Sequence, residues 1–571
     1  MAAYLHPNSQ AFAKRVSSPY FVDKSRLLIE LNACVDDVDR KYVCISRPRR
    51  FGKTVTAQML CAYYDRGVDN SRLFDQLQVG VEGSQIRLKK SENSTTTAQT
   101  EVEDIYRKHL NHYDVIFISM ATEYSSAGNS VANLKEQLEQ KIGAELKEHF
   151  PGAVKAESSK LWDMLSDVYS QYRQQYKEEH KDAEGAAAEI LVPGQFVFII
   201  DEWDSVIRSS RDSPQEIKDY LDFLRDLFKD RDYIALTYLT GILPIKKYGD
   251  HSALNMFDEY SVTSPGRFAP YLGFIKDEVT ALCTANSMSL EEMTHWYDGY
   301  TIGRAGHIFN PNSVCKALST GECDCYWTRT ESWEAISPYI ENNLEGLRDE
   351  VIRLIAGQSV RAETEAFEND MTTFKTRDDV LTLLAHLGYL TADNDVKGKK
   401  RFRMLRIPNF EIKEQFESTI ARSARYKKTA QAIARSEELL SALLAGDASK
   451  VAAGVAQAHM ENVSVIRYND ENSLSCVLTL AFYSARDRYT LIRELPTGKG
   501  FADLVFIPRP GVDTPALLIE LKYDHSAESA ISQIKEKHYP QALEAYRGNL
   551  ILAGISYDKD SKEHSCVIER A

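Results

Sequence analysis

Four short apolar runs, separated by longer helical or polar stretches, constrain the fold of this chain most strongly. They are KYVCIS at 41–46, YDVIFISM at 113–120, QFVFIID at 195–201 and YIALTYLTGI at 233–242. Each run is apolar almost throughout, which is typical of strands in a parallel sheet that helices cover on both faces. Residues 1–270 therefore predict one α/β domain, with polar surface insertions at 82–101 and 176–189.

The first run leads directly into a loop of phosphate-binding type. The segment ISRPRRFGKT ends with Gly52, Lys53 and Thr54, and a helical pattern follows. In a P-loop, backbone N–H groups and a helix N-terminus surround the phosphates, the lysine reaches the β- and γ-phosphate oxygens, and the hydroxyl binds Mg²⁺. The usual formula has a glycine five residues before Gly52, where this chain has Arg47. On this stretch alone, a nucleotide site and a basic turn that caps a helix are both open. The expected nucleotide-binding residues here are Arg49, Arg50, Phe51, Gly52, Lys53 and Thr54.

The third and fourth runs supply the other half of an ATPase site. FVFIIDEWD places Asp201 at a strand end, where we expect it to hold Mg²⁺ through water, and Glu202 beside it to polarise the attacking water. Asp204 either supports these two residues or caps the next helix. Thr240, in the LTG that ends the fourth run, either senses the γ-phosphate or closes the strand end. Together with the GKT loop, this pattern predicts ATP and Mg²⁺ as ligands.

The rest of the chain divides by its periodicity. Residues 271–420 are rich in helical patterns and end with a possible hairpin, which predicts a helical lid and a winged-helix-like unit near 345–420. Residues 421–460 are Ala-rich and predict a helical connector. Strand patterns return from 461 to 571, which predicts a separate, smaller α/β domain.

A second group of charged residues lies in this last domain. Asp503, in GKGFADLVFIP, is expected to open one strand, and Glu520 and Lys522 lie at i and i+2 in ALLIELKYD, on one face of the next. Two carboxylates can hold Mg²⁺ or Mn²⁺, and the lysine can orient or activate water near a scissile phosphate. Because the flanking residues are apolar, such charges are costly unless paired or metal-bound, which favours a site over the ordinary charges of an edge strand.

Several longer motifs occur in a fixed order: FVDKSRLL, SRPRRFGKT, FIIDEWD, YLTGILPIKKYG, HWYDGY and IFNPNSV. In these motifs the chain resembles the bacterial family of predicted AAA-type ATPases fused to a PD-(D/E)XK nuclease-like domain, which is similar to the archaeal ATPase branch of signal-transducing P-loop ATPases. The family's loop reads RPRRFGK, so the resemblance accounts for the absent glycine. It implies a P-loop ATPase core, a helical and winged-helix lid, and a restriction-endonuclease-like α/β domain.

The resemblance also implies further nuclease-site residues. Glu471 would support the metal ion, and the remaining candidates are Gln533, Glu494 and Tyr539. The alternative for all four is a polar surface position on an amphipathic element. Where the family often has an arginine after the second glycine of its GxG element, this chain has Phe501. HWYDGY (295–300) and NPNSV (310–314) match family signatures, and we interpret them as aromatic packing and a helix boundary.

Composition limits the possible partners. The net charge of -14 argues against a surface coated for nucleic acid, although it allows a local basic groove. The clearest basic run, KGKKRFR at 397–403, fits either a contact with a DNA or RNA backbone or a solvated hairpin. The first residues lack a signal-peptide pattern, and no apolar run approaches the roughly 18 residues of a membrane span, so a cytoplasmic protein without a membrane partner is expected. The 9 scattered cysteines predict reduced thiols.

These features predict an ATP-dependent or ATP-regulated hydrolase: an ATPase joined to a metal-dependent nuclease that acts on nucleic acid, DNA in the first instance. A role in defence against foreign DNA or in mobile-element biology fits this architecture. Two alternatives stay open. One is a nucleotide-switched scaffold whose nuclease fold binds nucleic acid or a protein without cutting, and the other is an ATPase that remodels proteins. Homo-oligomerisation and a protein trigger are open as well.

Overall fold

The structure is a computed structural model that divides into two compact units. It describes residues 4–81, 106–180, 191–210, 213–245, 253–327, 344–365, 367, 374, 376–392, 402–422, 427–462, 471–497, 500–509, 512–536, 543, 546 and 548–571. The first unit comprises residues 1–328 and 361–411, and the second comprises 329–360 and 412–571.

A five-stranded parallel sheet forms the centre of the first unit. Its strands are β1 (Tyr42–Ser46), β2 (Asp114–Ser119), β3 (Phe196–Asp201), β4 (Ile234–Gly241) and β5 (Asp258–Tyr260). Their order is β2-β3-β4-β1-β5, and every neighbouring pair is parallel. All residues of β1, β3 and β4 are buried, which is why these runs are apolar. The predicted parallel sheet is therefore confirmed.

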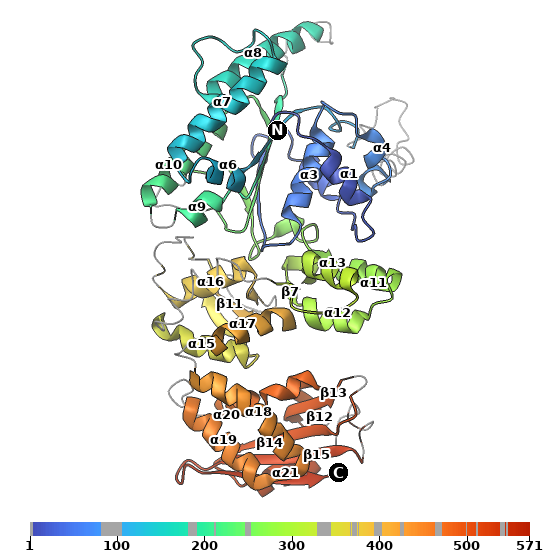
Figure 1. Cartoon of the computed structure of the whole chain (residues 1–571), viewed down its shortest axis with the longest axis vertical. Coiled ribbons are helices and arrows are strands. Elements are labelled where there is room, and N and C mark those ends of the chain that lie inside the picture. The colour runs from blue at the N-terminus through green and yellow to red at the C-terminus, as the bar shows by residue number, and fades with distance from the viewer. Residues whose placement is uncertain are drawn as a thin grey trace, which may run out of the picture. The chain divides into compact units, whose positions relative to one another are not determined.

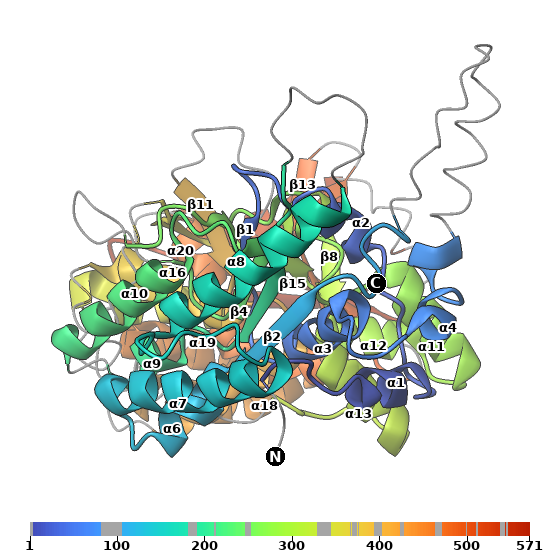
Figure 2. The same ribbon diagram turned by 90° about the horizontal axis from the view of Figure 1, so that it is seen from above.

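Helices cover both faces of this sheet. The helices α1 (Gln10–Val16) and α3 (Lys53–Tyr64) lie on one side, and α7 (Val131–His149), α8 (Leu161–Glu179) and α10 (Pro214–Phe228) lie on the other (Figures 1 and 2). The helix α10 shows how the sequence specifies this packing. It begins with a proline in its first turn and buries an apolar stripe that includes Ile217, Leu221 and Leu224. The expected insertion at 82–101 lies outside the described residues, and α8 extends into the one at 176–189.

The remainder of the first unit is a set of short helices and two small sheets. The elements are β6 (Phe274–Ile275), α11 (Lys276–Ala285), α12 (Leu290–Tyr297), β7 (Tyr300–Thr301), β8 (His307–Phe309), α13 (Pro311–Thr320), β9 (Val360–Glu363), α16 (Arg377–Leu387), β10 (Thr391–Ala392) and β11 (Phe402–Arg406). The sheet orders are β6-β8-β7 and β10-β11-β9. We call residues 271–327 and 377–411 the lid.

Two motifs of the sequence mark helix boundaries in the lid. HWYDGY contains the end of α12, and its Tyr297 and Tyr300 are both buried. NPNSV is the start of α13, where the Asn310 side chain accepts hydrogen bonds from the N–H groups of Asn312 and Ser313. The helix α17 (Phe410–Arg422) begins in the first unit and continues into the second.

The second unit contains a mixed five-stranded sheet. Its strands are β12 (Tyr489–Thr497), β13 (Gly500–Pro508), β14 (Ala516–Tyr523), β15 (Leu550–Tyr557) and β16 (His564–Arg570), in this order across the sheet. Only β14 and β15, among these pairs, run parallel. Its helices are α15 (Leu347–Ile355), α18 (Lys427–Ala445), α19 (Ala448–Asn462), α20 (Glu471–Ala481) and α21 (Ala527–Glu536). The Ala-rich stretch expected as a connector thus forms α18 and α19 of this unit.

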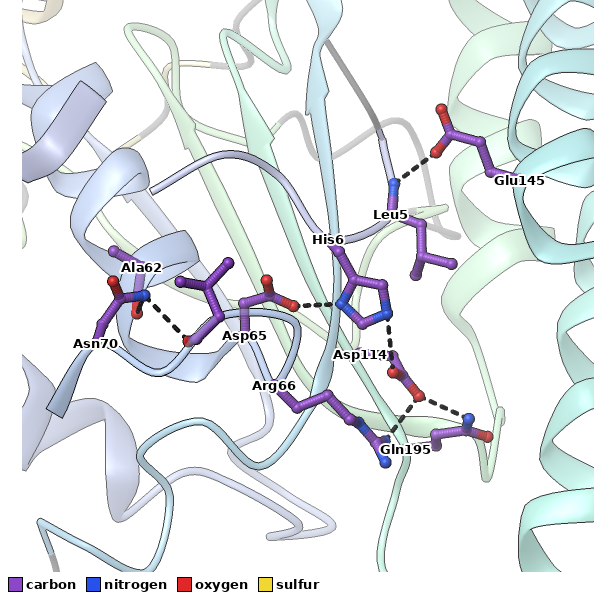
Figure 3. A network of polar contacts seen from close by, with 10 residues as sticks. Leu5, His6, Ala62, Asp65, Arg66, Asn70, Asp114, Glu145 and Gln195 are labelled. Atoms are coloured by element: carbon purple, nitrogen blue, oxygen red, sulfur yellow. Dashed lines mark hydrogen bonds and ion pairs between the residues drawn. The ribbon is translucent and has the colours of Figure 1, made fainter. Parts of the chain in front are cut away.

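The N-terminal segment covers the β2 edge of the first sheet. The His6 N–H donates to Val115 O at 3.0 Å and the Phe117 N–H to Tyr4 O at 2.9 Å. The His6 ring lies between Asp65, 2.6 Å from Nδ1, and Asp114, 3.4 Å from Nε2 (Figure 3). Burial alone would lower the pKa of His6, but the two carboxylates raise it above its usual value. This network holds the N-terminal segment beside Asp114, the first residue of β2.

Candidate functional site

The phosphate loop, residues 47–52, joins β1 to α3 at the carboxyl edge of the parallel sheet. Gly52 precedes α3 with φ of 86°, and Arg50 also has a left-handed backbone, with φ of 68°. A left-handed conformation at a residue other than glycine costs on the order of 1 kcal/mol, and it persists only where the surroundings enforce it. The first turn of α3 therefore presents its N–H groups to this loop, as a phosphate site requires.

Arg47 occupies the position of the absent glycine, and its side chain turns into the protein. It is fully buried, and its guanidinium donates to Ser46 O at 2.8 Å, Tyr260 O at 2.9 Å and Phe268 O at 3.3 Å. Burial lowers the pKa of Arg47 to about 10. Arg47 thus anchors the start of the loop to main-chain carbonyls, a role that the sequence did not indicate.

Lys53 begins α3 and lies against the same loop. Its Nζ donates to Arg47 O at 3.1 Å and to Pro48 O at 2.8 Å. Burial lowers the pKa of Lys53 to about 8, although Asp201, Asp204 and Glu202 act in the opposite direction. The ammonium group is therefore held within the loop by weak, neutral acceptors that phosphate oxygens can replace.

The acidic strand end lies next to this lysine. Asp201 is buried at the end of β3 and accepts hydrogen bonds from the Thr54 hydroxyl and from the Glu202 N–H, the latter at 3.0 Å. Burial raises the pKa of Asp201, while the Thr54 hydrogen bond and the Lys53 charge lower it. Glu202 follows with a left-handed backbone, φ of 53°. The structure thus brings together Lys53, Thr54, Asp201 and Glu202 as expected.

The strand β4 lies between the two halves of this site. Its Thr240 is in register with Asp201 of β3 and with Ile45 of β1, so the buried threonine lies at the same edge. Asp204 has a different role. Its Oδ2 accepts from Ile242 N at 3.2 Å, Leu243 N at 3.0 Å and Arg208 Nε at 3.1 Å, and it makes no side-chain cap to α9 (Ser205–Ser209). Asp204 therefore fixes the chain that leaves β4.

The side chains of the three residues before Gly52 do not all point toward the phosphate-binding side of the loop. Arg49 is half-buried, and Arg50 is exposed and donates from Nη1 to Tyr326 O at 3.0 Å. The Phe51 ring is fully buried, with its centroid 5.0 Å from that of Tyr300 in an edge-to-face arrangement. The expectation that Phe51 binds nucleotide is thereby restricted to its backbone N–H, because its side chain packs into the lid.

The second group of charged residues lies on neighbouring strands of the second unit. Asp503 is the fourth residue of β13 and does not open it, because the strand begins at Gly500. Antiparallel pairing with β14 includes Leu504 opposite Ile519, and beyond that pair the Leu521 N–H donates to Asp503 Oδ2 at 2.8 Å. The Asp503 carboxylate is therefore held directly beside Glu520.

Glu520, Lys522 and Gln533 complete this group. Glu520 is 2% exposed, the Lys522 Nζ lies 3.9 Å from its Oε1, and the Gln533 side chain of α21 donates to the same oxygen. A glycine makes this approach possible. Gly554 of β15 pairs with Glu520, and a Cβ at Gly554 would lie 2.3 Å from Ala527 O of α21. The sequence contained this signal as a glycine inside an apolar strand.

The other nuclease candidates cannot be placed to the same extent. Glu471 begins α20 and Glu494 lies in β12, but their side chains, like the whole of Tyr539, lie outside the described residues. Most of the basic run 397–403 lies outside them as well, and its Arg403 donates to Thr263 O at 2.7 Å.

The donor set of the second unit suits a hydrated cation. Within the described ranges, no group of three or more His, Cys, Asp and Glu side chains gathers as a metal site. Mg²⁺ usually keeps several waters and binds proteins through one or two carboxylates. Asp503 and Glu520 provide two such groups on neighbouring strands, and the residues present therefore fit Mg²⁺ better than a cation that needs a full protein cage.

Comparisons with known proteins agree with this division. Residues 10–249 match the family model described as Predicted AAA-ATPase, and residues 469–565 match that of the PD-(D/E)XK nuclease superfamily. The chain therefore carries an AAA-ATPase-like domain followed by a C-terminal PD-(D/E)XK nuclease-like domain. The resemblance that the sequence motifs indicated is thus confirmed, as are the P-loop fold of the first unit and the nuclease-like fold of the second.

Other comparisons add little to these two domain matches. No curated protein matches the sequence. Among solved structures, the ORC2 protein of Aeropyrum pernix in its ADPNP–ADP complexes matches with 12% identity and a TM-score of 0.22, covering 70% of this chain and 94% of that one. In the part of the chain that the structure describes, no helix is both long and apolar enough to cross a membrane.

Proposed function

We propose that the ATPase domain binds and hydrolyses ATP and thereby regulates a divalent-metal-dependent endonuclease that acts on DNA. The observation that carries this proposal is the group formed by Asp503, Glu520, Lys522 and Gln533 on adjacent elements of the second unit. Buried charges of this kind lower the stability of the folded protein unless they are paired, hydrogen-bonded or bound to a metal ion. A cytoplasmic location, homo-oligomerisation, and a role in defence or mobile-element biology belong to this proposal.

The chemistry of the first site follows from its residues. Thr54 and Asp201 would hold Mg²⁺, which neutralises charge on the β- and γ-phosphates when bound. Lys53 would exchange the carbonyls of residues 47 and 48 for phosphate oxygens. Glu202 would orient the attacking water, and Thr240, at the same edge of the sheet, would contact the γ-phosphate.

The second site would cleave a phosphodiester bond. Asp503 and Glu520 would hold the divalent cation, which polarises the phosphate and lowers the pKa of water when bound. Lys522 would orient the attacking water and stabilise negative charge that develops on the phosphate. Gln533 would keep the Glu520 carboxylate in one orientation, because its amide donates to Oε1.

Cleavage assays with matched variants test this proposal. Purified protein is incubated with single-stranded DNA, double-stranded DNA or RNA, with Mg²⁺ or Mn²⁺, and with or without ATP. Asp503→Asn should abolish cleavage and leave ATP turnover largely intact. The matched control is Asp524→Asn, because Asp524 follows β14 directly but is paired with Lys559 outside the group. Cleavage by Asp503→Asn at the wild-type rate would refute the nuclease assignment.

The nucleotide site has its own matched pair. Lys53→Ala should abolish ATP binding. Lys41→Ala should not, although Lys41 likewise donates to two main-chain carbonyls, those of Arg231 and Ile234, at the other end of β1. If Lys53→Ala retains wild-type ATP affinity, the phosphate-loop assignment is wrong.

A second candidate function is a nucleotide-switched scaffold. Hydrogen bonds within the protein favour this function, because they already use acceptor oxygens of both carboxylates. Glu520 is buried and accepts from Gln533, and Asp503 accepts from Leu521 N. In that case the chain would bind DNA or a protein partner without cutting under any of the conditions above. Stimulation of ATP turnover by DNA would separate this function from remodelling of proteins.

A further inference from the structure

The phosphate loop contacts the lid at three of its residues. Pro48 lies against Gly388, because a Cβ on Gly388 would be 2.7 Å from the Pro48 Cβ. Arg50 donates to Tyr326 O at 3.0 Å. The Phe51 ring packs edge-to-face on Tyr300 with a centroid distance of 5.0 Å. The loop is thus held by the lid as well as by the strand and the helix that it joins.

Tyr300 connects two of these contacts. Its ring supports Phe51, and its hydroxyl donates to Gly388 O at 2.8 Å. Gly388 follows α16 with a left-handed φ of 90°, a conformation that favours glycine. The Tyr300 side chain therefore supports both ends of segment 48–51, one through Phe51 and the other through Gly388, which lies against Pro48.

This support matters because the loop lacks the freedom that its missing glycine would give. Arg50 must hold a left-handed backbone, and it does so between Pro48 and Phe51, whose side chains are both buried. A second lid glycine, Gly273, makes room for the Phe51 ring, since a Cβ there would be 3.2 Å from Phe51 Cδ1 and 2.2 Å from Ile308 Cγ2. The shape of the loop therefore depends on how the lid packs.

We propose that Tyr300 and Gly388 are positioning residues of the nucleotide site, which hold the phosphate loop in its binding conformation from the lid. HWYDGY thereby acquires a role beyond packing. Because coupling between two equilibria is reciprocal, phosphate binding must in turn stabilise the packing of the lid. This inference rests on the proposed binding of ATP to the loop, and the two can fail separately.

ATP affinity and thermal stability of the full chain test the inference in matched tyrosine variants. Tyr300→Leu should weaken ATP binding at least tenfold. The control is Tyr297→Leu, because Tyr297 is equally buried in the same motif and its hydroxyl donates to Asp324 O, also at 2.8 Å. Its ring lies beside that of Tyr326, whose carbonyl accepts from the exposed Arg50, and not on the buried Phe51. The control should lower the melting temperature of the chain to a similar extent and leave ATP affinity within about twofold.

Conservative variants separate positioning from general damage to the lid. Tyr300→Phe keeps the ring and should restore affinity to within about threefold of the wild type. Gly388→Ala leaves Tyr300 and Phe51 unchanged but forces a Cβ against Pro48 and to within 3.0 Å of the Trp327 ring. It should weaken ATP binding, and this variant serves if Tyr300→Leu fails to fold. ATP should raise the melting temperature of the wild type by more than that of Tyr300→Leu.

The outcomes are distinguishable. If Tyr300→Leu and Tyr297→Leu weaken ATP binding equally, or if neither does while Lys53→Ala abolishes it, the positioning role is wrong and the nucleotide site stands. If Lys53→Ala binds ATP like the wild type, the proposed nucleotide site itself has failed.

Discussion

Restoring the missing glycine of the phosphate loop should harm this protein. In the variant Arg47→Gly, the loop regains the residue that the common P-loop formula has at this position. If the loop were a degraded copy of that formula, the variant would bind ATP more tightly. The structure predicts the opposite, because the Arg47 side chain anchors the loop to three main-chain carbonyls, which would all lose this donor.

The size of the effect follows from these contacts. A buried acceptor that loses its donor costs about 1–3 kcal/mol. The side chain also leaves a cavity, and glycine adds about 0.5–1 kcal/mol of backbone entropy in the unfolded chain. Removal of a buried charge recovers several kcal/mol of desolvation and offsets part of this loss. We expect a net destabilisation of the first unit of about 3 kcal/mol.

Thermal unfolding and hydrogen exchange measure this change. For a unit of this size, about 3 kcal/mol corresponds to a decrease of about 4 °C in melting temperature. Because a chain with two units need not unfold in one step, exchange of the β1 and β5 amides locates the effect. Arg47→Met fills most of the volume without donors, and it separates the cavity from the lost hydrogen bonds. An Arg47→Gly protein with wild-type stability and tighter ATP binding would refute this reasoning.

Three further predictions concern pH and the second site. ATP affinity should fall about tenfold per pH unit above about pH 8, because Lys53, with its pKa of about 8, must regain a proton to bind phosphate. Lys53→Arg should remove this dependence. An ATP affinity of the wild type that does not change with pH would contradict the prediction. Burial raises the pKa of Glu411 to about 7, despite hydrogen bonds from Ser313 and two main-chain N–H groups. The stability that its protonation confers should be complete below about pH 4.5 and lost as pH rises through about 7, and thermal melts of Glu411→Gln should show a weaker pH dependence in this range than those of the wild type. Gln533→Leu should lower DNA cleavage about 10–100-fold and raise the Mg²⁺ concentration required, with a decrease of only a few degrees in melting temperature from the lost hydrogen bond to Glu520. Unaltered metal dependence would rule out its proposed role.

Local periodicity in the sequence was sufficient to predict the central sheet and to indicate which charged residues lie near one another in the two candidate sites. Continuous apolar runs indicated the parallel sheet, and the positions of Lys53 and Asp201 at the run ends placed them at one edge, because parallel strands share a carboxyl edge. The i, i+2 spacing placed Glu520 and Lys522 on one face, which the 3.9 Å separation supports. In each case a short-range pattern carried the prediction.

Long-range partners were beyond such patterns. Arg47 finds its acceptors at residues 260 and 268, and Phe51 packs on Tyr300, more than 200 residues away in both cases. Helical periodicity likewise predicted helices in the Ala-rich stretch but not that they pack into the second unit. Side-chain direction at these positions depends on neighbours that only the folded chain brings together.

The N-terminal segment on β2 has a consequence for handling the protein. Residues 4–6 occupy hydrogen-bonding groups of β2, which is an edge strand of its sheet in the part of the chain that the structure describes. A truncation that removes them would expose Val115 and Phe117 as a template for strand addition. Shortened forms of this protein that begin after His6 should therefore self-associate through that edge, whereas the domain with its first residues intact carries its own blocking strand.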